Sequence, residues 1–134
     1  MIVIVIGSGA REHAIVTALR ADDDVDRIIC APGNAGIAAD AEVRSIDVND
    51  AQAIGDLAAE LDVDLVVIGP EVPLVAGAAD AVRERGIPCF GPSAEAAQLE
   101  GSKAFAKAVM AEADVPTALA RVWTSLDEVS AALD

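Results

Sequence analysis

The sequence predicts an α/β protein with an open parallel sheet and helices on both faces. Short apolar runs rich in β-branched residues alternate with segments whose apolar residues recur at helical spacing. The runs are apolar throughout, as in strands buried on both faces, and most of them end at a glycine or a proline. Strands that alternate with helices are joined by right-handed crossovers, which produce a parallel sheet.

The first half of the predicted sheet comes from three strands. The run at residues 2–6 consists only of Ile and Val and predicts a buried central strand. A helix with an apolar face follows it and ends at the acidic turn of residues 22–24. A second strand is predicted at residues 27–31, and a short third strand near residues 43–46.

The next helix and strand have clear start and stop signals. Ile54, Leu57, Ala58 and Leu61 fall at positions i, i+3, i+4 and i+7 and predict an amphipathic helix that follows an N-cap at Asn49 or Asp50. The apolar run at residues 65–68 predicts a further buried strand, which ends at Gly69.

The last helix and strand of the sheet complete the same alternation. Leu74, Ala78 and Val82 mark one helix that ends at Gly86, because glycine is the preferred residue after a helix C-terminus. The final strand is predicted at residues 87–90.

A second domain is predicted to begin near residue 101. A short helix at residues 94–99 precedes it, a strand is predicted at residues 118–123, and Ser125 is expected to cap a final helix. We therefore assign residues 1–100 to one domain and residues 101–134 to the start of another, since the latter segment is too short for a core of its own.

Composition excludes several classes of function. A net charge of -14, without any window rich in Lys or Arg, disfavours nucleic-acid binding because phosphodiester backbones would be repelled. The apolar runs are far shorter than the roughly 20 residues that span a bilayer, and no basic segment precedes the apolar start as in a signal peptide. Cys30 and Cys89 lie in predicted strands and are interpreted as buried thiols of a cytoplasmic protein.

Ligands of an open parallel sheet bind at the carboxyl ends of its strands. Four loops are expected there, at residues 7–13, 32–36, 69–77 and 91–93. The first follows the pattern of a phosphate-approach loop, with Gly-Ser-Gly between a strand and a helix. A dinucleotide is disfavoured, because Glu12 replaces the third glycine of that fingerprint and the second strand lacks a terminal acid.

Each polar residue of these loops has a functional and a structural interpretation. Arg11 pairs with a phosphate or carboxylate, or else Arg11 and Glu12 are solvated and His13 caps or packs. Asn34 binds a sugar hydroxyl or amine, or is a left-handed turn residue. Glu71, held between two prolines, binds an amine or vicinal hydroxyls, or is an acid at a helix N-terminus.

Four motifs in order carry a resemblance to a known family. They are Gly-Ser-Gly-Ala-Arg-Glu-His at 7–13, Ala-Pro-Gly-Asn-Ala-Gly at 31–36, Gly-Pro-Glu-Val-Pro-Leu at 69–74, and Phe-Gly-Pro at 90–92 with Gln-Leu-Glu-Gly-Ser-Lys at 98–103. Together they closely resemble the N-terminal part of the phosphoribosylamine–glycine ligases, and the resemblance covers essentially the whole chain. It implies a Rossmann-like domain, the pre-ATP-grasp domain, followed by the first elements of an ATP-grasp domain.

The resemblance also implies a reaction of purine biosynthesis. ATP, 5-phosphoribosylamine and glycine would give ADP, phosphate and glycinamide ribonucleotide, through phosphorylation of the glycine carboxylate and attack of the amine on the acyl phosphate. Such a mechanism depends on positioning and charge neutralisation rather than on a side-chain nucleophile. No catalytic side chain and no metal ligand are expected in this chain, and the main sites for ATP and Mg2+ or Mn2+ are expected beyond residue 134.

Roles carried over from the family remain expectations for individual residues. Lys103 would reach an ATP phosphate. The substrate-binding residues would be Gly7, Gly9, Arg11, Glu12, His13, Gly33, Asn34, Pro70, Glu71, Pro73 and Leu74. The resemblance implies a cytoplasmic, monomeric full-length enzyme with small-molecule substrates and no nucleic-acid or membrane partner, and the 134-residue chain is expected to lack ligase activity by itself.

Two alternatives stay open on the residues alone. One is the N-terminal domain of another ATP-grasp ligase, which the Arg-Glu-His and Pro-Gly-Asn-Ala-Gly segments disfavour. The other is a stand-alone module that binds a phosphosugar or nucleotide without catalysis.

Overall fold

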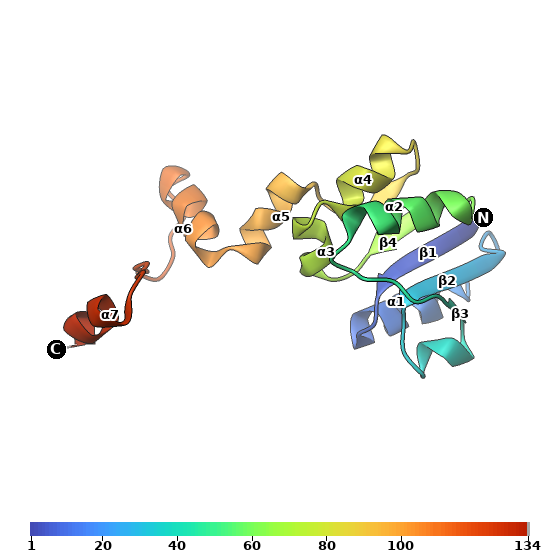
Figure 1. Cartoon of the computed structure of the whole chain (residues 1–134), viewed down its shortest axis with the longest axis horizontal. Helices are drawn as coiled ribbons and strands as arrows, with labels where there is room; N and C mark the ends of the chain where they lie inside the picture. The colour runs from blue at the N-terminus through green and yellow to red at the C-terminus, as the bar shows by residue number, and fades with distance from the viewer. Residues whose placement is uncertain (134) are drawn as a thin grey trace. The chain divides into compact units, whose positions relative to one another are not determined.

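The computed structural model describes residues 1–133, which form a first compact unit, Met1–Gly101, and a second that begins at Ser102. The first unit is an α/β fold with helices on both faces of a parallel sheet (Figure 1). Its strands are β1 Ile2–Gly7, β2 Arg27–Pro32, β3 Glu42–Val43, β4 Leu65–Ile68 and β5 Cys89–Phe90. The helices of the chain are α1 Ala10–Leu19, the 3-10 helix Ile37–Ala39, α2 Ala51–Glu60, α3 Glu71–Val75, α4 Ala78–Glu84, α5 Ala94–Gly101, α6 Lys103–Glu112 and α7 Leu126–Leu133.

The five strands are parallel and lie in the order β3-β2-β1-β4-β5. Strand β1 is central, and its Ile4 lies beside Ile29 of β2 and Val66 of β4. The chain adds strands first on one side of β1 and then on the other. The order of strands therefore reverses between β1 and β4, and a crevice opens at their carboxyl ends, where open α/β sheets bind ligands.

The sheet is buried on both faces, as the apolar runs predict. Ile4 and Ile6 pack on one face in a cluster that includes residues of α2 and α4. Val3 and Val5 pack on the other face with Val16 of α1. All of these side chains have no exposed surface. Successive strand residues point to opposite faces, so a continuous β-branched run fills both cores at once.

The structure decides between the two predicted caps of one helix and divides another predicted helix into two. Asp50 rather than Asn49 caps α2, since its carboxylate accepts a hydrogen bond of 2.9 Å from the Ala53 amide. The single helix expected through Leu74 and Val82 is instead two helices, α3 and α4. Gly77 separates them with a φ of 91°, a left-handed conformation that interrupts helical hydrogen bonding.

Three predicted strands also need correction. The last strand is confined to Cys89–Phe90 and does not include residues 87 and 88. The third strand is confined to Glu42–Val43 and does not extend to residue 46. Residues 118–123 form no strand, and within the described part of the chain no strand lies beside them to pair with. Leu119 and Val122 are accordingly exposed. An isolated apolar segment lacks the ladder hydrogen bonds that would fix it as a strand.

The second unit contains α6 and α7 joined by an irregular segment. Ser102 caps α6 by accepting a hydrogen bond from the Phe105 amide, and Ser125 caps α7 in the same way for Glu128. Lys107 of α6 donates to Thr117 Oγ1 at 2.7 Å, which ties the helix to the segment that follows it. Among residues 1–133, none of the helices is long and apolar enough to cross a bilayer.

Candidate functional site

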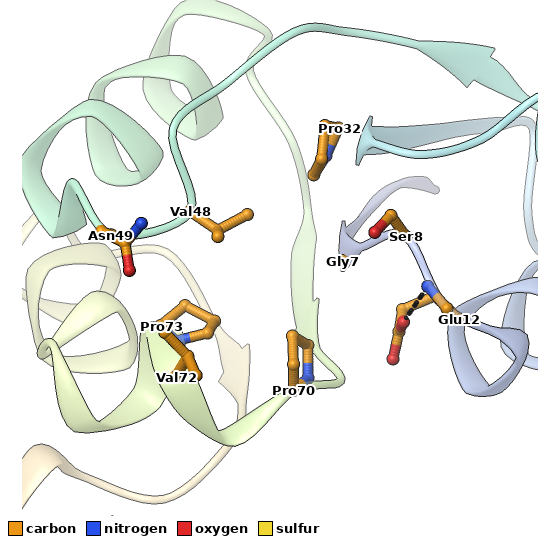
Figure 2. A pocket seen from close by; sticks show the side chains of 10 residues that line it. Gly7, Ser8, Glu12, Pro32, Val48, Asn49, Pro70, Val72 and Pro73 are labelled. Carbon is orange, nitrogen blue, oxygen red and sulfur yellow. Dashed lines mark hydrogen bonds between the residues drawn. The ribbon is translucent and has the colours of Figure 1, made fainter.

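A cavity of about 420 Å³ lies at the carboxyl edge of the sheet, at the crevice between β1 and β4 (Figure 2). The loops after β1, β2 and β4 and the segment before α2 contribute its walls. The lining residues are Gly7, Ser8, Gly9, Glu12, Pro32, Val48, Asn49, Pro70, Val72 and Pro73. Three of the four expected loops therefore meet at one cavity.

The loop after β1 is shaped by its glycines. Gly7 has a φ of 132°, a conformation that residues with a side chain avoid, and it turns the chain out of the strand. Gly9 follows as the extended N-cap of α1. The first turn of α1 therefore begins at the cavity wall, where backbone N–H groups of a helix start without acceptors inside the helix.

Glu12 is buried, with 4% of its surface exposed, although it is an acid in the first turn of a helix. Its Oε2 accepts a hydrogen bond of 2.6 Å from the Gly9 amide, drawn as a dashed line in Figure 2. The interpretation of Glu12 as a solvated residue is therefore wrong. Glu12 lines the cavity but is held there by the protein itself.

Arg11 and His13 do not line the cavity. The guanidinium of exposed Arg11 donates to the carbonyl oxygen of Gly69 and so links the first turn of α1 to the loop after β4. The ring of half-exposed His13 lies 3.4 Å from a carboxylate oxygen of Asp40. A Cβ on Gly36 would be 3.0 Å from Cε1 of His13, so the ring packs directly on that loop.

Asn34 fixes the loop after β2 against the loop after β1. Its Nδ2 donates to the carbonyl oxygen of Ser8 at 2.8 Å. Its Oδ1 accepts from the amides of Gly36 and Ile37 at 2.8 and 2.9 Å. Gly33, with a φ of 65°, makes the turn that precedes it. Neither Gly33 nor Asn34 lines the cavity, and of the loop after β2 only Pro32 does.

The segment expected as one loop after β4 contains helix α3, which separates the residues that the sequence grouped together. Pro70 and Pro73 line the cavity. Glu71 instead lines a neighbouring hollow of about 260 Å³ together with Val72, Val75, Glu100 and Gly101. Leu74 has 6% of its surface exposed and belongs to the core. Its side chain is placed for packing rather than for contact with a substrate.

Val48 and Asn49 are part of the cavity and were missed as site residues. They lie across it from Gly7 and Ser8 (Figure 2). After β3 the chain returns over the carboxyl edge before α2 begins, which brings these residues there. Asn49 preceded a predicted helix and was considered only as a cap, so no pattern in the sequence marked it as a cavity residue.

Lys103 belongs to the second unit and is exposed there. It lines a hollow of about 250 Å³ with Ala104, Lys107, Ala120, Arg121 and Val122. Three of these side chains are cationic, in a chain that carries a net charge of -14. The Arg121 guanidinium lies 6.0 Å from the centre of the Trp123 ring, within the range of a cation–π contact.

The two cysteines are free thiols. Cys30 is fully buried beneath the loop after β1, and its Sγ donates a weak hydrogen bond to the Gly7 carbonyl oxygen at 3.4 Å. Burial, assisted by the nearby Glu12 carboxylate, raises the pKa of the Cys30 thiol to about 11. Burial also raises the pKa of Cys89.

This shift predicts a loss of stability at alkaline pH. The folded state holds the Cys30 proton more tightly than the unfolded state, whose thiol pKa is about 8.5. The stabilisation is therefore complete below that pH and is lost as pH rises toward about 11. We expect the unfolding free energy, measured in urea at increasing pH, to fall over this range and to fall less in Cys30→Ala. An equal fall in both proteins would contradict this assignment. The chain has no tyrosine to contribute in the same range.

Residues 1–133 include no group of three or more His, Cys, Asp or Glu side chains that would hold a metal ion.

Comparison with known proteins identifies a family for this arrangement. The sequence model of the family described as "Phosphoribosylglycinamide synthetase, N domain" matches residues 1–100. The phosphoribosylamine–glycine ligase of Streptomyces coelicolor is 62% identical over 133 residues, and that of Mycobacterium tuberculosis (strain H37Rv) is 58% identical over 134. These alignments cover 99% and 100% of the chain, which spans 32% of the length of either relative.

Solved structures show the same fold. The crystal structure of phosphoribosylamine–glycine ligase from Thermotoga maritima superposes with a TM-score of 0.70 at 28% identity, covering 99% of this chain and 30% of that one. The biotin carboxylase domain of Hydrogenobacter thermophilus 2-oxoglutarate carboxylase, solved with MgADP, ADP and bicarbonate, gives a TM-score of 0.72 at 22% identity. It covers 98% of this chain and 32% of that one. At this identity the second likeness concerns the fold alone.

Proposed function

The chain belongs to the phosphoribosylglycinamide synthetase N-domain family, and on that premise we propose that it is the substrate-binding N-terminal part of a phosphoribosylamine–glycine ligase. The observation that carries the proposal is the convergence of three family motifs on one cavity at the switch point of the sheet. The proposed domains are residues 1–100 for this substrate site and 101–134 for the start of the ATP-grasp region.

The lining of the cavity indicates which end of 5-phosphoribosylamine it would take. Among the described lining residues there is one acid, Glu12, and no base. A dianionic phosphate would be repelled there, whereas a sugar ring and its amine would be accommodated. Three prolines and two valines offer apolar contact to ring carbons, and Ser8 and Asn49 offer hydrogen bonds to hydroxyl groups. The ribosyl and amine end would therefore lie in the cavity, with the phosphate directed outward.

The reaction places modest chemical demands on this part of the enzyme. ATP would phosphorylate the glycine carboxylate, and the amine of phosphoribosylamine would attack the acyl phosphate and displace phosphate. The amine is already a nucleophile, so the protein has to orient it and exclude water. The loops after β1, β2 and β4 would do this, fixed to one another by Arg11 and Asn34.

ATP would be bound outside this cavity. Lys103, Lys107 and Arg121 line a separate hollow, and three cations in an acidic chain suit a polyphosphate. We assign Lys103 to an ATP phosphate on this basis. Mg2+ would supply neutralisation of the phosphate charge, and no ligand for it is assigned to residues 1–133.

Glu71 provides a selective test of the substrate assignment. Its carboxylate lines the hollow that shares Val72 with the cavity, so it is placed at the margin of the proposed substrate site. In an enzyme that carries this chain, Glu71→Gln is expected to raise the KM for phosphoribosylamine about tenfold and to leave the KM for ATP nearly unchanged, since a hydrogen bond to a charged group contributes about 1.5–3 kcal/mol. An equal rise in KM for phosphoribosylamine and for ATP would show that Glu71 does not bind phosphoribosylamine selectively and would contradict the assignment.

The proposed function can be tested with a chimera. This chain would replace the matching segment of the Streptomyces coelicolor enzyme, with which it is 62% identical. We expect glycine- and phosphoribosylamine-dependent release of ADP close to that of the parent. A chimera that folds and binds ATP but forms no glycinamide ribonucleotide would contradict the proposal. It would instead favour a module that binds a related phosphosugar.

A further inference from the structure

Three glycines surround the buried side chain of Glu12. Its Oε2 accepts the Gly9 amide hydrogen at 2.6 Å. A Cβ added to Gly7 would lie 2.6 Å from Cγ of Glu12, and one added to Gly69 would lie 2.7 Å from Cδ. The side chain therefore lies against the backbone of both the loop after β1 and the loop after β4.

Little of the Glu12 side chain is accessible to a substrate. Only 4% of the residue is exposed, and one carboxylate oxygen is engaged by the Gly9 amide. The other oxygen is packed against Gly69. A substrate ligand would need an accessible oxygen, whereas this carboxylate is held on the inner side of the two loops.

The second loop is attached at the same point by a neighbouring residue. Arg11 donates to the Gly69 carbonyl oxygen, so the first turn of α1 contacts Gly69 through two consecutive side chains. Gly69 immediately precedes Pro70, which lines the cavity. The Gly69 amide also donates to the Ile6 carbonyl oxygen at 3.1 Å, which joins the ends of β4 and β1, and the Glu12 side chain covers Gly7 and Gly69 beside that bond.

We propose that Glu12 is a positioning residue: its side chain acts as a spacer that fills the space over Gly7 and Gly69 and so holds the loops after β1 and β4 in place at the wall of the substrate cavity. The absence of side chains at Gly7 and Gly69 is then a requirement of the spacer. This inference rests on the proposed function for its consequence in catalysis, but the spacer itself is a property of the chain.

The spacer can be tested in the chain alone by a double-mutant cycle. Gly69→Ala would collide with Glu12, and Glu12→Ala would remove both the spacer and the collision. We expect each single variant to lower the unfolding midpoint, and we expect Gly69→Ala to cost much less when Glu12 is already alanine. Gly101→Ala is the matched control, because its Cβ would collide with Val75, 2.5 Å away, and not with Glu12. Its effect should add to that of Glu12→Ala. Additive effects of Gly69→Ala and Glu12→Ala would overturn the spacer.

Kinetics of the chimera separate positioning from substrate binding. Glu12→Gln keeps the length of the side chain and an oxygen that can accept the Gly9 amide hydrogen, so we expect kcat/KM for phosphoribosylamine to stay within a few-fold of the parent. Glu12→Ala should lower it on the order of 100-fold, as expected for a misplaced site, with little change in the KM for ATP. Glu95→Ala, an exposed acid in the first turn of α5, is the control and should change neither value.

The outcomes of the two experiments are distinguishable. Loss of activity in Glu12→Gln equal to that in Glu12→Ala would show a charge contact with the substrate and overturn the positioning role. If folded Glu12→Ala keeps the parent's kcat/KM for phosphoribosylamine, Glu12 stabilises the fold but does not position the substrate site. An inactive chimera before any mutation would count against the proposed function, and the cycle in the chain would still decide the spacer.

Discussion

Replacing Ile4 with alanine is expected to destabilise the first unit by about 2–5 kcal/mol, because the substitution leaves a cavity in a closely packed core. Ile4 has no exposed surface and lies in the central strand, with Ile29 and Val66 beside it in the neighbouring strands. The surrounding strands are hydrogen-bonded on both sides, so they cannot collapse into the space.

The change can be measured by urea unfolding followed by circular dichroism. Leu99→Ala is the control, because it also shortens an aliphatic side chain in the first unit, but Leu99 is 52% exposed. Its effect should be well below that of Ile4→Ala. Similar losses in the two variants would mean that β1 is not the centre of the core.

Replacing Gly7 with alanine is the second substitution with a large expected effect. Its φ of 132° costs a residue with a side chain about 1–3 kcal/mol, and its Cβ would collide with Cγ of Glu12. We expect both a lower unfolding free energy and a loss of ligand binding, because Gly7 lines the cavity.

Gly86→Ala is the matched control for backbone strain. Gly86 also has a positive φ, 77°, but a Cβ there would meet no atom within 4 Å. It follows α4 and does not line the cavity. Gly86→Ala should therefore lower stability without affecting ligand binding. Equal effects of the two substitutions on stability and binding would show that the contact with Glu12 is unimportant.

The sheet was predictable because burial on both faces leaves a simple signature. The Ile and Val run at residues 2–6 has no polar position, as is typical of a strand buried on both faces of a parallel sheet, and β1 is that strand. Gly86 likewise ended a helix as expected. Gly77 was not recognised as an interruption, because helical spacing continued across it from Leu74 to Ala78.

The edge of the sheet that holds the cavity was also predictable, but its lining was not. Loops after parallel strands must open at one edge, which located Gly7, Pro32 and Pro70. Val48 and Asn49 reach the cavity through a return of the chain that depends on tertiary packing. The burial of Glu12 depends on three glycines from two loops, Gly7, Gly9 and Gly69. No local sequence pattern indicates that these two loops will both contact Glu12.

We propose that the cavity at the carboxyl edge binds the ribosyl end of the substrate. This binding can be tested by titrating the chain with glycinamide ribonucleotide and following the backbone amide signals. We expect shifts of the lining amides that carry an N–H, including those of Ser8, Gly9, Asn49 and Val72, and we expect these shifts to be lost in Gly7→Ala. Shifts confined to the hollow around Lys103, or none at millimolar ligand, would contradict the proposal.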